Sequence, residues 1–519
     1  MLTMIRKRWQ IFLIVGAGLI LRIPFRSEVL FNWDSVNFAL GIQGFDIVGH
    51  RPHPPGNILY IYLARLLTYF THDENLSMVS MSIAGGILSA IILYWFAQHI
   101  HNKTDALFSA LLLLTSPVAW LYDEVALTYS LEMMFSVAIA YTCYKALEGE
   151  TSFAYLSAFL LSVAGGFRPS SLLVFGPLFL FVLLKTPKKH ALFCLVGSLA
   201  LCSAWGILLI RDSGGLGTLL TATKNLSMLL DPPSTTAILH PLFQAGHIGI
   251  LLVAFYWMGI IALPRRNAPN WERTFFNIWL IPGILIMILY HMGQSGYILF
   301  LLPALFLFTP QLMRGLLERL TPNNPSDEAK SERSIQQKMY MNMAVMPIMG
   351  IIIFYLTSLP VISGVNACWR QAKEQLGTID SSRMMVITNN SKYRDFLGFR
   401  NVEFYLPHLR TYYFSAAFPN DVLFNPGGIR YVGWKYMAFN KEDNYRRGPE
   451  EDRKQLLIKF WDGLEGILFT DPDMAAFVKT GDKTNNEKLQ IEQFGCFYYV
   501  RLPQNTKELR VEEGQLVLY

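Results

Sequence analysis

A series of apolar stretches, each about 20 residues long, constrains this chain more than any other feature. As an α-helix, such a stretch crosses a hydrocarbon core of roughly 30 Å with its backbone polar groups satisfied internally. Only 16% of the 519 residues are charged, whereas soluble domains carry roughly a quarter. The sequence therefore predicts a mainly α-helical, multi-pass membrane protein. About eleven transmembrane spans are expected, at 9–25, 76–98, 104–121, 127–147, 152–167, 169–185, 190–210, 246–263, 274–291, 297–313 and 340–362.

The distribution of basic residues predicts the orientation of these spans. Cytoplasmic loops carry an excess of Lys and Arg, and alternating passes place every basic cluster on one face. The N-terminus is then cytoplasmic and the C-terminus extracytoplasmic. Because the net charge of +6 comes from these short loops, it does not indicate nucleic-acid binding. The clusters are Arg6-Lys7-Arg8, Lys185 with Lys188-Lys189, Arg265-Arg266 and the segment from Arg314 to Lys338.

The opposite face is expected to gather the unusual polar residues. It receives the first extracytoplasmic loop (26–75), the Asp123-Glu124 turn, Arg168, the loop 211–245 and the turn from His291 to Tyr297. Within the first loop, residues 56–72 are apolar but interrupted by an arginine, and they follow two prolines. Proline suits the first turn of a helix, and we expect this helix to lie along the membrane surface.

The residues after 362 differ in character from the spans. Short runs of β-forming residues alternate with turn formers, as in Met384–Thr388, Gly466–Phe469 and Cys496–Val500, so residues 363–519 are expected to form a small extracytoplasmic α/β domain. The polar segment 321–338 is expected to be a cytoplasmic linker. Cys368 and Cys496 lie in a compartment that permits a disulfide, and they either pair or remain free.

The first loop concentrates residues that suit chemistry. Asp34 lies between Trp33 and Phe38, and a carboxylate in a poorly hydrated setting at a membrane surface suits a general base; the alternative is a helix N-cap or a solvated loop acid. His53 lies in a stiff corner, His50-Arg51-Pro52-His53-Pro54-Pro55-Gly56, which either presents donors to a phosphate or merely turns the chain. Asp46 precedes that corner.

These motifs resemble the first extracytoplasmic loop of the GT-C glycosyltransferases, which include the protein O-mannosyltransferases and the aminoarabinose transferase of lipid A. In the mannosyltransferases the loop reads Asp-Glu-x-x-Phe and then Phe-Asp-x-His-Pro-Pro. Asp34 to Phe38, Phe45-Asp46 and His53-Pro54-Pro55 follow the same order. Ser35 replaces the Glu of the family, and about six residues separate Asp46 from His53 where the family has one. Gly165-Gly166-Phe167-Arg168-Pro169 is similar to the Gly-x-Arg-Pro turn of bacterial members.

The resemblance implies a polyprenyl-phosphate sugar donor, a lipid, glycan or protein acceptor, and a multi-pass protein of the bacterial inner membrane. Asp34 is then the base that deprotonates the acceptor hydroxyl, with inversion at the sugar. Arg168 is the main phosphate ligand, unless it only extends toward lipid headgroups. Glu132 either orients the acceptor or is a structural acid with a hydrogen-bonding partner. The remaining expected pocket residues are His53, His291, Gln294, Tyr297 and Asp46.

Other site classes find little support in the sequence. It contains no Walker A pattern, no His-Glu-x-x-His and no clustered Cys and His ligands, so neither a metal nor a cofactor is expected. Two rival functions remain: a non-enzymatic transporter or flippase for lipid-linked sugars, and a membrane-anchored binding protein whose tail carries the function. A transporter typically has charged or broken helices at mid-membrane, whereas most ionisable residues here lie at predicted span ends.

Overall fold

The computed structural model describes residues 2–229, 269–289, 295–320, 328–377, 380, 382–389, 397–414, 457–476, 478–481, 489–512 and 515–519. The described chain forms two compact units. The helical unit comprises Met1–Arg26 and Gly41–Val361, and the C-terminal unit comprises Ser27–Leu40 and Ile362–Tyr519. The first loop is therefore divided between the two units, and the helix that carries Asp34 begins in the C-terminal unit.

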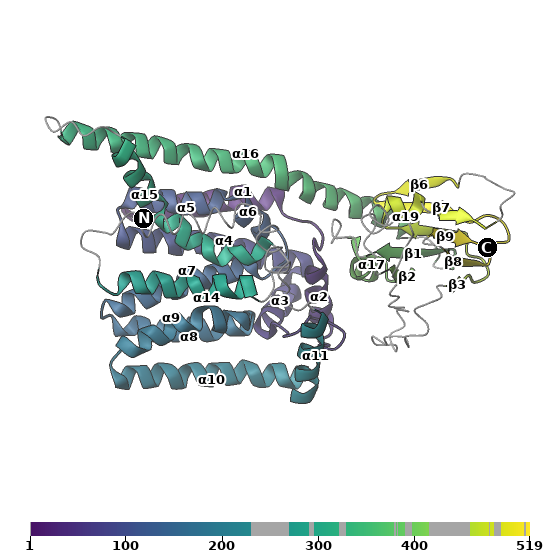
Figure 1. Ribbon diagram of the computed structural model, residues 1–519, viewed down its shortest axis with the longest axis horizontal. Coiled ribbons are helices and arrows are strands. Elements are labelled where there is room, and N and C mark those ends of the chain that lie inside the picture. The colour runs from purple at the N-terminus through teal and green to yellow at the C-terminus, as the bar shows by residue number, and fades with distance from the viewer. Residues whose placement is uncertain are drawn as a thin grey trace. The chain divides into compact units, whose positions relative to one another are not determined.

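Helices of the helical unit lie side by side, and α11 runs across one end of the bundle (Figure 1). Its elements are α1 (Leu2–Arg22), η1 (Ile23–Phe25), α3 (Ile58–Thr71), α4 (Glu74–Ile100), α5 (Lys103–Thr115), α6 (Pro117–Asp123), α7 (Tyr129–Leu147), α8 (Thr151–Phe167), α9 (Ser170–Lys185), α10 (Lys188–Asp212), α11 (Leu216–Leu229), α14 (Glu272–Leu289), η2 (Ser295–Leu301) and α15 (Leu302–Leu320). Two elements straddle the division between the units, α2 (Trp33–Gln43) and α16 (Glu328–Leu376).

Ten of the eleven predicted spans coincide with helices of the described chain, and the eleventh, 246–263, lies outside the described residues. A stricter test asks which described helices are both long enough and apolar enough to cross a membrane. Four described helices are long and apolar enough to cross a membrane, Glu74–Ile100, Lys188–Asp212, Gly296–Arg314 and Gln336–Leu376, and a bent pair of helices makes a fifth if it is one span. Membrane character is thus confirmed, while the predicted number of spans is met only in part.

The bent pair is α5 and α6, which the sequence predicted as one span at 104–121. Pro117 begins α6, and Ser116 before it is extended (φ −60°, ψ 120°). Proline has no N–H to donate and disfavours the helical conformation in the residue before it. The helix therefore breaks here, with a bend of 62°.

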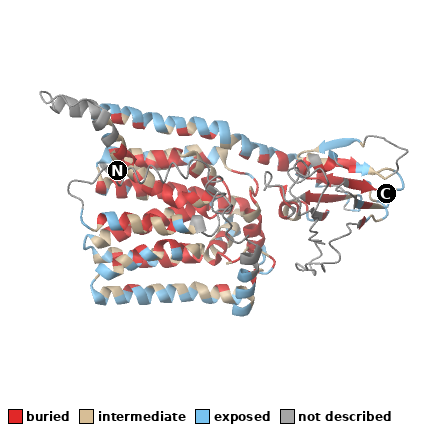
Figure 2. Cartoon of the chain, viewed as in Figure 1, coloured by how far each residue is buried: buried red, intermediate tan, exposed pale blue. Residues whose placement is uncertain are grey.

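Burial separates central helices from peripheral ones (Figure 2). In the most apolar window of α4, 72% of residues are buried, against 11% for α10 and 17% for α16. Yet α10 is as apolar as α4, and it exposes Phe193, Leu195 and Leu199. Apolar side chains directed outward from a bundle are typical of a surface that meets lipid.

The long helix α16 corrects one detail of the prediction. Residues 328–338, expected in a linker, form its first turns. The helix ends at Leu376, and the two units divide within it, between Val361 and Ile362. The rest of the expected linker, 321–327, lies outside the described residues.

The C-terminal unit is an α/β structure, as the sequence predicts. One sheet has the strand order β2-β1-β4-β7-β6 and the other has the order β3-β8-β9-β5. Helix α17 (Phe399–Tyr405) connects the parallel neighbours β1 and β2, and α19 (Pro472–Ala476) follows β4. The strands are β1 (Met384–Asn389), β2 (Arg410–Phe414), β3 (Leu457–Lys459), β4 (Gly466–Phe469), β5 (Val478–Thr480), β6 (Ile491–Phe494), β7 (Phe497–Arg501), β8 (Glu508–Glu512) and β9 (Gln515–Leu518).

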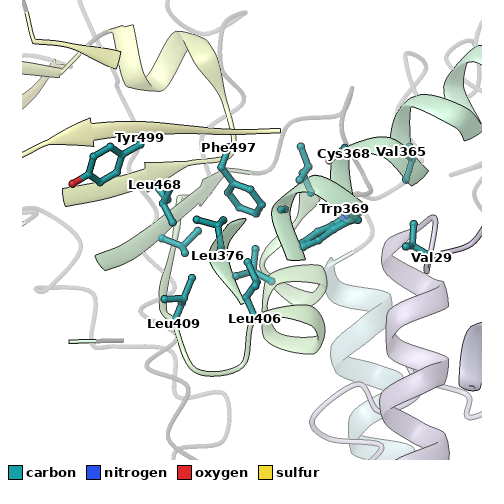
Figure 3. Close-up of a cluster of buried hydrophobic side chains, with 14 residues drawn as sticks. Val29, Val365, Cys368, Trp369, Leu376, Leu406, Leu409, Leu468, Phe497 and Tyr499 are labelled. Atoms are coloured by element: carbon teal, nitrogen blue, oxygen red, sulfur yellow. The ribbon is translucent and has the colours of Figure 1, made fainter. Parts of the chain in front are cut away.

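One apolar cluster of the C-terminal unit lies between the larger sheet, α16 and α17 (Figure 3). Trp369, Leu406 and Phe497 come from those three regions, and Val29 joins them from the first loop. Cys368 on α16 forms a disulfide with Cys496 in the turn between β6 and β7, so the two cysteines left open by the sequence are paired.

Candidate functional site

Arg168 occupies a sharp turn between two packed helices. Helix α8 ends at Phe167, and α9 begins at Ser170. Arg168 is extended (φ −152°, ψ 104°), as expected for a residue that precedes a proline. Its N–H donates to the carbonyl of Ala164 at 2.8 Å. The backbone is thus anchored, and the side chain leaves the helix ends toward α7.

The guanidinium of Arg168 lies between two aromatic rings and beside a carboxylate. Its carbon is 4.6 Å from the ring centroid of Tyr129 and 4.7 Å from that of Tyr297. Its Nη1 lies 3.3 Å from Glu132 Oε2 and donates to Thr128 Oγ1 at 3.2 Å. Burial alone would lower the pKa of this side chain, but Glu132 and the two tyrosines keep it raised. The site therefore holds a permanent cation in a largely buried position.

A second buried arginine of the helical unit is held more tightly. Arg22 donates from Nε and Nη2 to Asp123 Oδ2 at 2.8 and 2.6 Å, and from Nη2 to the carbonyl of Leu114 at 3.0 Å. Charge-assisted N–H···O bonds are roughly 2.7–2.9 Å long. The Arg22 contacts to Asp123 meet that length, whereas those of Arg168 exceed it. Arg168 is therefore the more loosely held of the two guanidiniums, and it is also the more exposed one.

Close packing brings the proline corner near the Arg168 turn. A Cβ added to Gly166 would overlap the side chain of Leu59 at the start of α3, and one added to Gly56 would lie 2.6 Å from Leu209 of α10. Gly56 also has a φ of +105°, which a residue with a Cβ rarely adopts. The backbone therefore favours glycine at position 56, and at position 166 any larger residue would displace Leu59.

The corner itself is ordered by its own backbone contacts. Asp46 Oδ1 accepts the N–H groups of Val48 and Gly49 at 3.1 and 3.0 Å, and Asp46 pairs with Arg51 through two backbone hydrogen bonds. His53 follows, and its carbonyl accepts the N–H of Gly56 at 3.0 Å. One carboxylate oxygen of Asp46 thus stabilises the turn, and the roles predicted for Asp46 and His53 in binding substrate stay predictions.

Asp34 lies in the first turn of α2 and is half-buried. Its N–H donates to Asn32 Oδ1 at 2.8 Å, so Asn32, and not Asp34, supplies this capping interaction. Asp34 is part of the C-terminal unit, whereas Arg168 contacts Glu132 and Tyr297 within the helical unit. His291 and Gln294, the other predicted pocket residues, lie outside the described residues.

Sequence reasoning missed Thr128 and Tyr129, which complete the surroundings of Arg168. A signal for Thr128 was present, because residues four apart lie on the same face of a helix and Thr128 precedes Glu132 by four. The Arg22–Asp123 pair was also missed, because its partners are far apart in sequence. Within the described ranges, no group of three or more His, Cys, Asp or Glu side chains is placed to hold a metal ion.

Comparisons with known proteins agree with this architecture. Residues 52–208 match a family model described as dolichyl-phosphate-mannose-protein mannosyltransferase. This segment includes His53, Glu132 and Arg168, and it begins after Asp34 and Asp46. None of the curated protein sequences matches the chain significantly.

Two crystal structures of ArnT from Cupriavidus metallidurans share the fold. The structure bound to undecaprenyl phosphate is 10% identical, with a TM-score of 0.55 over 95% of this chain and 97% of that chain. The apo structure is 11% identical, with a TM-score of 0.55 over 96% and 98%. The apo oligosaccharyltransferase of Archaeoglobus fulgidus is 13% identical, with a TM-score of 0.46 over 90% and 70%. The predicted resemblance to the GT-C glycosyltransferases is confirmed, and the ArnT matches show that the chain has that fold.

Proposed function

We propose that this membrane protein, which shares the fold of ArnT, transfers a sugar from a polyprenyl-phosphate donor to an acceptor hydroxyl on the extracytoplasmic face. The observation that carries the proposal is the cation at Arg168, buried between Tyr129 and Tyr297 at one end of the helical unit. One of the matched ArnT structures is a complex with undecaprenyl phosphate, and a phosphate at a lipid surface is the ligand that such a cation suits.

Arg168 would stabilise the leaving group. When the bond between the anomeric carbon and the phosphate oxygen breaks, the electron pair stays with the phosphate, whose negative charge grows. A preorganised cation in a site of low dielectric stabilises that charge more than water does. Because its present contacts to Glu132 and Thr128 are long, a phosphate oxygen can share the guanidinium without breaking short hydrogen bonds.

Asp34 would act on the acceptor. In this proposal the acceptor hydroxyl gives its proton to the carboxylate of Asp34 while its oxygen bonds to the anomeric carbon opposite the departing phosphate, so the configuration inverts. A base within hydrogen-bonding reach typically contributes about 10²- to 10⁴-fold to the rate. Glu132 would keep Arg168 in position until the phosphate binds.

The test uses the full-length protein in nanodiscs. Donors are undecaprenyl phosphate linked to tritiated mannose, glucose or aminoarabinose, and acceptors are envelope lipid, glycan and protein fractions. We expect at least one donor to be consumed with transfer of label, and Arg168→Gln to slow that transfer by about 10²- to 10³-fold.

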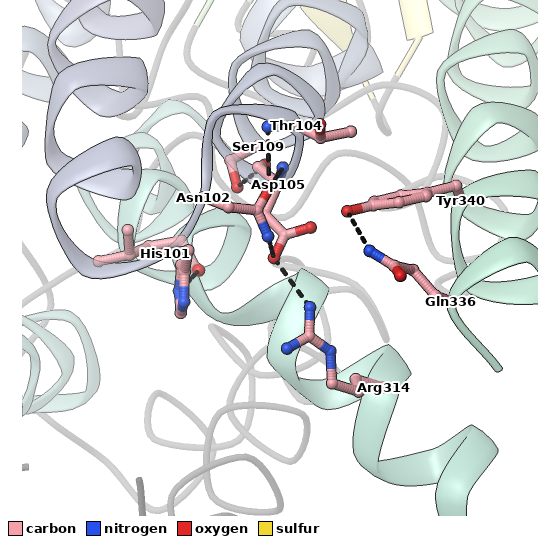
Figure 4. Close-up of polar contacts among 9 residues, drawn as sticks. His101, Asn102, Thr104, Asp105, Ser109, Arg314, Gln336 and Tyr340 are labelled. Carbon is pink, nitrogen blue, oxygen red and sulfur yellow. Dashed lines mark hydrogen bonds and ion pairs between the residues drawn. The ribbon is translucent and has the colours of Figure 1, made fainter. Parts of the chain in front are cut away.

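A matched control is Arg314, another arginine of the helical unit that pairs with a carboxylate, Asp105, at 3.2 Å (Figure 4). Arg314→Gln should leave the transfer rate close to that of the wild type. Movement of intact donor across the bilayer without release of undecaprenyl phosphate would contradict the proposal and favour a flippase. Equal rates for wild type and Arg168→Gln would remove Arg168 as the phosphate ligand.

A further inference from the structure

The segment that leads to Asp34 is hydrogen-bonded to the C-terminal unit through Leu30. The N–H of Leu30 donates to Tyr405 Oη at 2.6 Å, and its carbonyl accepts from Asn401 Nδ2 at 3.2 Å. Both partners lie on α17, 375 and 371 residues further along the sequence. Leu30 is fully buried, so its backbone groups need protein partners. Two side chains of α17 therefore satisfy both the N–H and the carbonyl of Leu30.

Apolar packing and an ion pair hold the residues just before Leu30. Val29 joins the cluster around Trp369 (Figure 3). The ring of Trp369 lies 4.8 Å from that of Tyr405. The N–H of Glu28 donates to Asn366 Oδ1 at 2.9 Å, and its carboxylate pairs with Arg370 at 2.5 Å. The Glu28 pair is exposed and contributes little by itself, so the buried contacts of Val29 and Leu30 determine where the segment lies.

A third contact reaches the residue adjacent to Asp34. Gly398, directly before α17, lies so close to Trp33 that an added Cβ would be 3.1 Å from Cε3 of the indole. Glycine permits this approach. Contacts with α17 and α16 thus cover the chain from Glu28 to Trp33, and Asp34 follows immediately.

The helices that make these contacts are joined to the larger sheet, which with α16 and α17 forms one framework. Helix α17 is the crossover between the parallel strands β1 and β2. Helix α16 is joined to the turn between β6 and β7 by the disulfide Cys368–Cys496. A displacement of α17 within this framework would move Leu30 and Trp33, and with them the start of α2.

We propose that the C-terminal unit positions the base of the transfer reaction, and that Tyr405 and Asn401 are positioning residues for Asp34. This inference rests on the proposed function, because it assigns the tail a role in the same reaction. Placement errors of about 1 Å at a reacting group can cost roughly 10²-fold in rate. The C-terminal unit is then part of the catalytic apparatus, although Tyr405 and Asn401 act through Asp34 and not on the substrate.

The test compares Tyr405→Phe and Asn401→Leu, each of which removes one hydrogen bond to Leu30 at nearly constant volume. Tyr499→Phe is the matched control, because Tyr499 lies in the same apolar cluster and donates to the carbonyl of Glu465, outside the first loop. We expect each test variant to lower kcat by about tenfold, with KM for the donor changed by less than about twofold. The double variant should lose less than the product of the two effects, because both hydrogen bonds act through Leu30. The control should match the wild type.

Two further readouts distinguish positioning from general damage. Amide hydrogen exchange in residues 27–40 should speed up in both test variants and not in Tyr499→Phe. In an Asp34→Asn background, the same substitutions should lower the residual rate by less than about twofold, because residues that act through one group are not additive. An equal loss of rate in both backgrounds would overturn the inference, as would unchanged kcat in an active enzyme.

The inference and the proposed function can fail separately. If the wild type consumes no donor, the proposed function is contradicted, and the anchoring of the first loop is then judged by hydrogen exchange alone. If the wild type is active but exchange in residues 27–40 is the same in Tyr405→Phe, the positioning role is contradicted and the transferase activity stands.

Discussion

Two arginine–carboxylate pairs of the helical unit show how similar chemistry can serve structure or function. Arg22 and Asp123 have 1% and 0% of their side chains exposed, and their shortest contact is 2.6 Å. Arg168 and Glu132 have 14% and 5% exposed, with a contact of 3.3 Å. The first pair also uses a main-chain carbonyl of α5, whereas the second has tyrosine rings near the cation.

The two arginines differ in how tightly their present partners hold them. A guanidinium with short bonds to a carboxylate and a backbone carbonyl is already committed to the fold, and moving it would leave buried partners unsatisfied. A guanidinium with long contacts can gain an anionic ligand at lower cost. We therefore assign Arg22 to the packing of α1 against α5 and α6, whereas Arg168 is the arginine that the proposed function uses to bind phosphate.

The largest expected effect is the loss of the tight pair. Arg22→Gln leaves Asp123 buried without its cation and should lower the free energy of unfolding by about 3–5 kcal/mol. Thermal unfolding in detergent measures this loss. The double variant Arg22→Met with Asp123→Leu, which removes both charges, should recover much of it. A single variant as stable as the wild type would show that the pair is not structural.

Glu124, in the turn after α6, should make the stability of the region around the tight pair depend on pH. Glu124 is buried beside the tight pair, and burial raises the pKa of its carboxyl from an ordinary 4.5 to about 9. Because the acid binds its proton more strongly when folded, its contribution to stability is fully present below pH 4.5. This contribution, on the order of a few kcal/mol, is lost as the pH rises toward 9. The melting temperature should therefore fall between pH 5 and pH 9.

Glu124→Gln is the variant that isolates this group. The amide oxygen can still accept the indole N–H of Trp120, as Glu124 Oε1 does at 2.6 Å, but it does not titrate. The fall in melting temperature should be smaller in this variant than in the wild type. Parallel pH profiles for the two proteins would contradict the role of Glu124.

One substitution made at both arginines compares the pairs directly. Lysine keeps the charge but lacks the fork that binds carboxylate or phosphate with two donors. Arg22→Lys should cost about 1–3 kcal/mol of stability and leave the affinity for undecaprenyl phosphate unchanged. Arg168→Lys should do the reverse, raising the Kd for undecaprenyl phosphate about tenfold with a near-normal melting temperature. If the two variants lost stability and affinity to the same extent, the structural role of Arg22 and the binding role of Arg168 would not be distinct.

A smaller effect is expected from the carboxylate of the loose pair. Glu132→Gln removes the anion that competes with phosphate for Arg168, so undecaprenyl phosphate should bind a few times more tightly, most clearly at low ionic strength. Titration of nanodiscs with undecaprenyl phosphate measures this change. Asp105→Asn, at the Arg314 pair, is the matched control and should not alter the Kd. Weaker binding by Glu132→Gln would show that the phosphate does not compete with Glu132.

Much of the helical architecture could be predicted from local properties of the sequence. Apolar length located the helices, and alternating β-forming residues located β1, β4 and β7. The positive-inside rule placed Glu132, Arg168 and Tyr297 on one side, and the structure brings those three together. Features that depend on contacts distant in sequence were not predictable. Leu30 and Tyr405 are 375 positions apart, and Arg22 and Asp123 are 101 positions apart, so no local pattern joins either pair.

The proposed transfer depends on Asp34 as its base, and replacing that carboxylate by an amide tests this dependence. Wild type and Asp34→Asn are compared in transfer from the tritiated undecaprenyl-phosphate sugar that the wild type consumes, with binding of undecaprenyl phosphate measured in parallel. Asp73→Asn is the control, because Asp73 is an exposed helix N-cap and asparagine caps equally well. We predict a rate about 10²- to 10⁴-fold lower for Asp34→Asn, with unchanged affinity and a normal control. Equal rates for Asp34→Asn and the wild type would contradict the account.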